Sequence, residues 1–199
     1  MILREETAFP TSALPLAELK AHLRLGTGFG TEDLQDTVLI QAMRAAHAAI
    51  EGRTGKGLIE RQFSLQLDRW RGLDKHCLPI APVSAISEVI IYDRLGAGTT
   101  IDPTRYGLTR DDQRPAFIAT GGCLPTIPMG GEARLTLTAG YGPQWASLPA
   151  DLGQAVLILA AHYYENRGQG DITAKVLPDA VRGLIERYRT VRLFGGACP

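Results

Sequence analysis

The stretch ADLGQAVLILAAHYYENR, residues 150–167, is the most informative part of the chain. Within it, the run Val156-Leu157-Ile158-Leu159 places apolar side chains on every face of a helix, whereas a surface helix keeps a polar face. We therefore predict a helix that is buried on several sides, in its own domain or against neighbouring subunits. The core-like run from Leu152 to Tyr164 is shorter than the about 20 residues that a bilayer requires, so no membrane partner is expected.

Five residues of this helix are candidates for core or subunit packing: Val156, Leu159, Tyr163, Asn166 and Arg167. Asn166 tolerates the left-handed conformation in which many helices end. Arg167 can donate hydrogen bonds to backbone carbonyls or to a carboxylate. We expect both residues to anchor the helix end.

Upstream, residues 12–54 also have helical periodicity. A glycine-containing break at 26–30 divides them into two helices. Apolar residues in the second helix recur at helical spacing and form one stripe. That stripe consists of Leu39, Met43, Ala46 and Ile50.

Between the helical regions, the periodicity changes to two. Phe63, Leu65 and Leu67 alternate with polar residues, as in a half-buried strand. Turn signals recur about every ten residues, which favours an antiparallel sandwich or barrel over βαβ units. Further strands are predicted at 83–92, 105–109, 116–120 and 134–139.

These patterns predict an α+β fold, a small helical bundle with an inserted antiparallel β domain. Two N-terminal and two C-terminal helices form the bundle. We assign residues 1–58 and 141–199 to the helical domain and residues 59–140 to the β domain. The last helix is predicted over 179–194, with Val181, Leu184, Ile185 and Tyr188 facing inward.

The composition is that of a folded protein with balanced charge. Of 199 residues, 45% are hydrophobic, which is enough for a sizeable core and excludes an intrinsically disordered chain. Lys and Arg number 21, and Asp and Glu also number 21, so the chain as a whole is no polycation. Binding to nucleic acid would depend on a local basic patch.

No motif for catalysis, a cofactor or a metal emerges. The segment Gly52-Arg53-Thr54-Gly55-Lys56-Gly57 lacks the leading glycine and the trailing Ser or Thr of a P-loop, so we predict a helix end there. The histidines lack ligand spacing, and those within helices are expected to pack in the core. We predict no catalytic residue, no metal and no cofactor, and we expect that the chain is not an enzyme. The four histidines are His22, His47, His76 and His162.

The three cysteines, Cys77, Cys123 and Cys198, include no C-x-x-C pair. An odd number without such a pair is typical of free thiols in a reducing compartment, so we predict free thiols. A metal bound by His76, Cys77 and Cys123 is an alternative that such scattered ligands indicate only weakly.

The C-terminal segment 180–199 has an excess of positive charge, because Glu186 is its only acidic residue. Its arginines either form a solvated helix face near the negative end of the helix dipole or bind an acidic partner or passing DNA. The apolar residues Leu193 and Phe194 would anchor such docking; alternatively, Tyr188 and Phe194 close the helical core. The arginines are Arg182, Arg187, Arg189 and Arg192.

Five segments occur in an order that is characteristic of one family. They are LAELKAHLR at 16–24, AAHAAIE at 45–51, LPIAPV at 78–83, AGYG at 139–142, and LPADL at 148–152 with HYYENR at 162–167. Together they resemble the head–tail connector, or adaptor, proteins of tailed phages. The resemblance covers residues 12–168. Within the family, the sequence is most similar to the adaptors of alphaproteobacterial gene transfer agents, which are particles built like small tailed phages.

The resemblance implies a structural role without a cofactor. Members form a ring beneath the portal protein, extend the DNA channel and carry the stopper or tail-completion protein. For this chain it implies a ring of about twelve copies and DNA that passes without sequence-specific binding. It also implies assembly in the host cytoplasm and then a place at the head–tail interface of the virion or gene transfer agent particle. The portal-docking residues would be Arg182, Arg187, Arg189, Arg192, Leu193 and Phe194.

Two hypotheses from other classes stay open. A DNA-binding, ring-forming packaging component would also be helical with basic patches, and its free form would bind DNA in a salt-dependent way. A small enzyme of unknown type would require a deep pocket with convergent polar groups.

Overall fold

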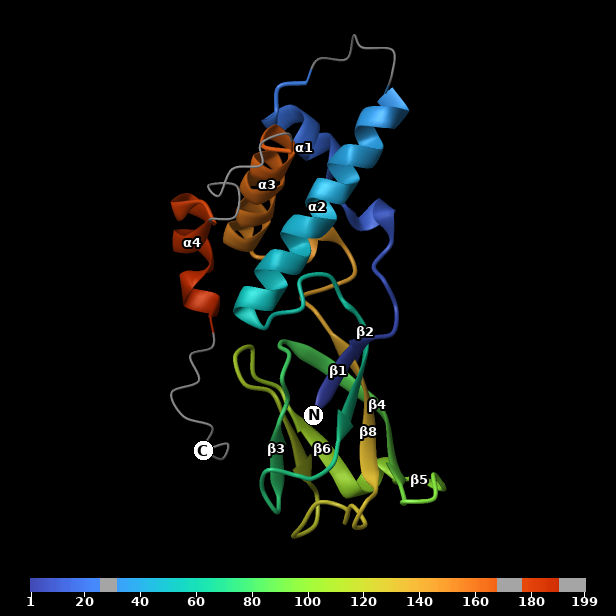
Figure 1. Cartoon of the computed structure of the whole chain (residues 1–199). Helices are drawn as coiled ribbons and strands as arrows, with labels where there is room; N and C mark the ends of the chain where they lie inside the picture. Colours follow the sequence, from blue (N-terminus) through green and yellow to red (C-terminus); the bar gives the residue numbers. More distant parts are fainter. Residues whose placement is uncertain (26–31, 168–176, 190–199) are drawn as a thin grey trace. The chain divides into compact units, whose positions relative to one another are not determined.

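The computed structural model describes residues 1–25, 32–167 and 177–189. These residues contain four α-helices and eight β-strands, and every ladder between the named strands is antiparallel (Figure 1). The predicted α+β class is therefore confirmed.

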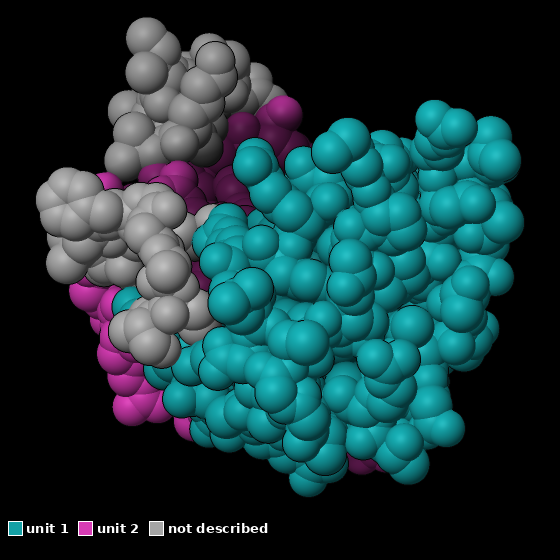
Figure 2. Space-filling view, turned by 90° about the horizontal axis from the view of Figure 1, so that it is seen from below, with its two compact units in different colours: residues 1–8, 60–141, 190–199 teal, residues 9–59, 142–189 magenta. Residues whose placement is uncertain are grey.

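The described residues fall into two compact units, which Figure 2 colours separately. The helical unit comprises Phe9–Ile59 and Gly142–Arg189. The β unit comprises Met1–Ala8 and Glu60–Tyr141. The first eight residues thus belong to the β unit, although the sequence analysis assigns them to the helical domain.

Helix α3 (Ala150–Glu165) is the central element of the helical unit. It contacts α1 (Leu16–His22), α2 (Glu32–Thr54) and α4 (Asp179–Ile185), as Figure 1 shows. Short 3-10 turns at Thr11–Ala13 and Trp145–Ser147 precede α1 and α3. The helix predicted from the apolar run is therefore present, and elements of its own chain cover several of its sides, while Leu157 and Ile158 are only half-buried.

Burial within the helical unit follows the predicted periodicity. The α2 stripe of Leu39, Met43, Ala46 and Ile50 is fully buried. On α3, Leu152, Ala155, Val156, Leu159 and Ala160 are all 1% exposed or less. Small residues on both helices allow close approach, and each larger aliphatic side chain contributes about 1.5–3 kcal/mol through its removal from water.

Helix α2 ends where the sequence excludes a P-loop. The Thr54 hydroxyl donates to the carbonyl of Ile50 (2.8 Å), and the Gly55 N–H donates to the carbonyl of Glu51 (2.8 Å). Gly55 has a φ of +68°, a left-handed conformation that glycine adopts without steric cost. Gly55 therefore terminates the helix, as predicted, whereas Gly52 lies within the last turn of α2.

The β unit has two antiparallel sheets. In the larger sheet the strand order is β1-β2-β8-β4-β5, and in the smaller one it is β3-β7-β6. The strands are β1 (Ile2–Glu5), β2 (Arg61–Leu67), β3 (Lys75–Cys77), β4 (Val83–Tyr92), β5 (Gly98–Thr100), β6 (Tyr106–Thr109), β7 (Ala116–Ala119) and β8 (Glu132–Ala139).

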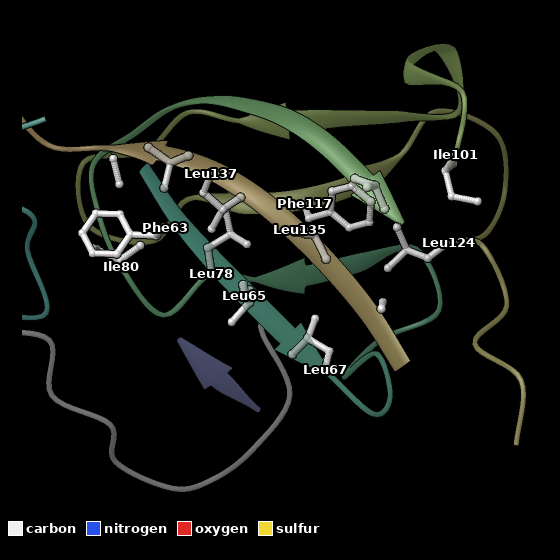
Figure 3. Close-up of a cluster of buried hydrophobic side chains, with 14 of the residues drawn as sticks. Phe63, Leu65, Leu67, Leu78, Ile80, Ile101, Phe117, Leu124, Leu135 and Leu137 are labelled. Carbon is white, nitrogen blue, oxygen red and sulfur yellow. The ribbon is translucent and has the colours of Figure 1, made fainter. Parts of the chain in front are cut away.

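Alternating residues of the strands form one hydrophobic core (Figure 3). Phe63 pairs with Leu137 and Leu65 with Leu135 across β2 and β8, so the apolar residues of both strands share a face. Phe117 of the smaller sheet joins the same core. The apolar residues that alternate along β2 are therefore on its buried face, as predicted.

Three short strands, β1, β3 and β5, are not predicted from the sequence, and β1 is the one at the edge of the larger sheet next to β2. It pairs with β2 from Ile2 opposite Gln66 to Glu5 opposite Phe63. Polar contacts reinforce it: Arg61 Nε lies 2.8 Å from Glu5 Oε1. Only Leu3 of this strand packs against the core, and such a short strand with one core residue gives no readable periodicity.

The cysteines differ from one another. Cys123 is an exposed, free thiol, as predicted. Cys77 is disulfide-bonded, so the prediction of a free thiol is wrong there.

His76 of β3 is a buried titratable group. Its Nδ1 accepts a hydrogen bond from the Arg71 N–H (3.2 Å), and its ring stands edge-on to Trp70 at 5.6 Å between centroids. Burial, followed by the positive charge of Arg71, lowers the pKa of His76 to about 4. The folded β unit therefore holds this imidazole neutral.

We predict that His76 makes the chain sensitive to acid. The unfolded chain binds the His76 proton near pH 6.5, whereas the folded chain binds it near pH 4, so stability falls as the pH drops through this window. The expected loss is about 3 kcal/mol. Urea unfolding of the wild type and of His76→Gln, from pH 7.5 to 4, measures the difference. Equal pH slopes for the two proteins would contradict the prediction.

Candidate functional site

The described part of the C-terminal segment folds onto α3. Helix α4 is followed by a single 3-10 turn, Glu186–Tyr188, and Arg189 is already extended. Val181, Ile185 and Tyr188 are buried, as predicted, whereas Leu184 is only half-buried, and α4 contacts α3. The helix predicted over 179–194 is therefore interrupted at Arg189, and residues 190–194 lie outside the described residues.

Asp151 in the first turn of α3 fixes the end of this segment. The Tyr188 hydroxyl donates to Asp151 Oδ1 at 2.6 Å, and Arg187 Nε lies 2.9 Å from Asp151 Oδ2. Arg187 also donates to the Tyr188 oxygen. The carboxylate lies near the positive end of the α3 dipole, so its charge stabilises the helix start as well.

The environment of Tyr188 favours a protonated phenol that donates a hydrogen bond to Asp151. Burial, together with the hydrogen bond to Asp151, raises the pKa of Tyr188 above its ordinary value. The phenol therefore keeps its proton at neutral pH and donates it to the carboxylate. For Tyr188, the structure favours the interpretation that this residue closes the helical core.

Each described arginine of the predicted docking set has a carboxylate partner in the same chain. Arg182 Nη1 lies 3.3 Å from Asp179, and Arg189 Nη1 lies 3.0 Å from Glu186. Together with the Arg187–Asp151 pair, these contacts balance the charge of the segment. The side chains stay 55%, 49% and 68% exposed at Arg182, Arg189 and Arg187. The remaining docking candidates, Arg192, Leu193 and Phe194, lie outside the described residues.

Three of the predicted packing residues, Val156, Leu159 and Tyr163, lie within α3 and differ in burial. Val156 and Leu159 are buried inside the helical unit, so they pack within the chain. Tyr163 is half-buried on the same helix. The first two therefore stabilise the helical core of one copy.

Asn166 and Arg167 both bond to carbonyls at the end of α3. The Asn166 amide donates to the His162 carbonyl at 2.8 Å, and its backbone has a φ of −95°. The expected left-handed turn is therefore absent, because the side chain closes the helix instead. Arg167 donates to the Tyr164 carbonyl (2.6 Å) and stacks over the Tyr164 ring at 4.2 Å.

His47 and His162 behave as packing residues. The ring of His47 lies between those of Phe9 (5.0 Å) and Trp145 (5.9 Å), and His162 contacts Tyr163 at 6.3 Å. Among the residues that the structure describes, no three His, Cys, Asp or Glu side chains gather as a group able to hold a metal. In the same part of the chain, no helix is both long and apolar enough to cross a membrane.

Asp151, which ties the C-terminal segment to α3, is not among the residues predicted from the sequence. Its position directly after Pro149-Ala150 at a helix start favours a carboxylate on dipole grounds alone. The partners Arg187 and Tyr188 are 36 and 37 residues away along the chain. No local spacing indicates that they meet.

Three solved structures match the chain over nearly its whole length. A chain of the neck of an empty gene transfer agent particle, computed with C6 symmetry, is 47% identical over 100% of both chains, with a TM-score of 0.89. A chain of the virion of a native gene transfer agent particle is 48% identical over 98% of this chain and 99% of its own, with a TM-score of 0.86. A chain of the neck of a native particle, computed with C12 symmetry, is 44% identical over 100% of both, with a TM-score of 0.85.

Identity of 44–48% over whole chains is far above the level at which only a fold is shared. The α+β chain is therefore a structural component of a phage-like particle. More narrowly, it belongs to the family of gene transfer agent neck proteins. No protein-family model matches the chain, and a search of curated proteins also finds no match.

We predict that Asp151 and Tyr188 stabilise the helical unit together. Asp151→Ala removes the charge at the α3 start and the partner of two side chains, at a cost of about 2 kcal/mol. Tyr188→Phe removes one hydrogen bond to a charged group, at a cost of about 1 kcal/mol. The double variant should cost less than the sum of the two, by at least about 0.5 kcal/mol. Urea unfolding of the four proteins measures this coupling.

Asp179→Ala is the matched control, because Asp179 also lies in the first turn of a helix after a proline. Its side chain is 92% exposed, so its removal should change stability by less than about 0.5 kcal/mol. Strict additivity of Asp151→Ala and Tyr188→Phe, or an equal effect of Asp179→Ala, would refute the proposed anchoring role of Asp151.

Proposed function

We propose that the chain is the head–tail adaptor of a gene transfer agent particle. It assembles as a ring under the portal, extends the DNA channel and provides the platform for the stopper or tail-completion protein. The observation that carries this proposal is identity of 44–47% over 100% of chains from gene transfer agent necks. The order of the five resembling segments at 16–167 points to the same role.

The proposed ring contains about twelve copies. The related necks were computed with C6 and with C12 symmetry, and a twelvefold ring satisfies both, because sixfold rotation is contained in twelvefold rotation. Contacts in such a ring are heterologous: one patch of each copy meets a different patch of the next until the ring closes. The particle would receive the chain during assembly in the host cytoplasm.

The charge distribution supports a channel that DNA passes without being held. Lys and Arg equal Asp and Glu in number, and affinity for DNA rises with the number of phosphates that a protein neutralises. The arginines of the segment 182–189 already pair with carboxylates of the chain. A structural part of this kind carries out no catalysis and requires no cofactor.

We propose that the segment from Val181 to Pro199 docks the ring onto the portal. A guanidinium has five N–H donors, so the exposed Arg182, Arg187 and Arg189 can bond an incoming carboxylate while they keep their partners in the chain. The candidates Arg192, Leu193 and Phe194 complete this surface in the proposal. The helical domain then serves the portal side.

Native mass spectrometry of the intact chain with its portal tests both proposals. We expect about twelve copies bound to each portal, in complexes whose mass does not change when DNA is added. With the cysteines of both chains reduced, a chain that lacks residues 190–199 should keep the melting temperature of the intact chain and bind no portal, because these residues supply the remaining docking contacts.

Three outcomes would count against these proposals. A single bound copy per portal would refute the ring. Portal binding by the truncated chain, or its unfolding, would refute the docking role of the C-terminal segment. Salt-dependent DNA binding by the free chain would favour a DNA-binding packaging component instead.

A further inference from the structure

Three large hydrophobic side chains of the β unit are almost completely exposed. Leu73 is 84% exposed, Leu95 is 83% exposed and Met129 is 97% exposed. Side chains this exposed contribute little to folding, because their apolar surface stays in water. Isolated exposed hydrophobics are common on proteins, so the grouping and rigidity of these three decide whether they have a role.

Strand pairing places the three side chains at one end of the β unit. The last residues of β2 and β4 both pair with the first residues of β8. The loops 68–74 and 93–97 therefore lie at the same end as the segment 120–131, which leads into β8 (Figure 1). We call these three loops the loop end, and Figure 2 looks onto it.

The turn that carries Leu95 is held in one conformation. Asp93 Oδ1 accepts hydrogen bonds from the N–H groups of Leu95 (2.8 Å) and Ala97 (2.9 Å). The Asp93 N–H in turn donates to the Ala97 carbonyl at 3.0 Å. Gly96 has a φ of +84°, which L side chains rarely adopt. Leu95 is therefore presented at the tip of an ordered turn.

The turn that carries Met129 is equally constrained. The Gly131 N–H donates to the Pro128 carbonyl at 2.9 Å, and Gly130 has a φ of +75°, so Met129 occupies the corner of a tight turn. A Cβ on Gly131 would lie 2.3 Å from the Tyr92 carbonyl oxygen. The Met129 turn thus packs against the end of β4, next to the turn of Leu95.

Leu73 is fixed through its own backbone. Its carbonyl accepts a hydrogen bond from the Leu124 N–H at 2.7 Å, which joins the loop 68–74 to the segment 120–131. A Cβ on the neighbouring Gly72 would lie 2.8 Å from the Lys75 carbonyl oxygen, so the chain turns tightly at this point. All three hydrophobic side chains therefore stand on ordered backbone.

The charge of the loop end selects the class of partner. The segment 120–131 contains no charged residue, and the loops 68–74 and 93–97 contain three arginines and three aspartates. Such a balance disfavours DNA and anionic lipid, which both bind an excess of Lys and Arg. Ordered apolar tips without net charge fit an apolar pocket on a protein.

We propose that the loop end docks the chain onto the neck protein on its tail side, with Leu95 and Met129 inserted into an apolar pocket of that protein. Little conformational entropy is lost on binding, because the turns are already fixed. The proposal rests on the adaptor function, in which portal contacts belong to the helical unit and a second surface carries the next protein. The loop end belongs to the β unit and is that second surface.

The test introduces Leu95→Ser and Met129→Ser together in cells that produce the particles. Quantitative mass spectrometry of the purified particles then gives the ratios of their proteins. We expect this chain at its wild-type ratio to the capsid protein and at least tenfold fewer tails per head. The purified double variant should melt as the wild type does, because neither side chain is buried. Should its melting temperature fall, Met129→Ser alone, at the more exposed site, is expected to give the same loss of tails.

The matched control is Arg110→Ser, in the exposed turn at the opposite end of the β unit, between β6 and β7. It should leave both ratios unchanged. Wild-type numbers of tails per head in the loop-end variants would overturn the proposal. Loss of this chain from the heads would also overturn it, because Leu95 and Met129 would then contribute to binding the portal. Absence of the wild-type chain from tailed particles would instead overturn the adaptor function itself.

Discussion

Val156 and Leu159 of α3 lie at 1% exposure or less among the other helices, and this burial is the contact on which the helical unit depends. A helix with so long an apolar run is unstable when most of it faces water, so its neighbours must cover several of its sides, and only Leu157 and Ile158 of the run 156–159 stay half-buried. Asp151 adds a specific connection, because it joins the start of this helix to Tyr188 and Arg187. The C-terminal segment is thereby held on α3 up to Arg189.

One continuous piece of chain supplies the central element of each unit. Strand β8 lies in the middle of the five-stranded sheet, and α3, which follows it in sequence, lies in the middle of the helices. Within the helical unit, a parallel bridge between Ile59 and Gly142 joins the point where the chain leaves to the point where it returns. The segment 60–141 therefore leaves and re-enters the helical unit at adjacent points, whereas the first part of the β unit, residues 1–8, precedes the helical unit in the chain.

The sequence predicts the elements whose burial is periodic and misses those that depend on distant polar contacts. The α2 stripe and the alternation along β2 are both readable, because one face of each element is buried. Strand β1 is not readable, because it depends on Glu5 and Arg61, which are far apart in the sequence. The arginines at 182–189 are predicted as a charged surface. Asp179 and Glu186 lie three residues before their arginine partners, but the pairing of Arg187 with Asp151 becomes visible only in three dimensions.

The central claim is that about twelve copies of this chain form a ring between portal and tail. A reconstruction of the neck of the native particle, calculated without imposed symmetry, tests it most directly. We predict a closed ring at that level, with α3 packed against α1, α2 and α4 of the same copy as it is here. Density that locates the chain elsewhere in the particle, or as an isolated copy, would contradict the claim.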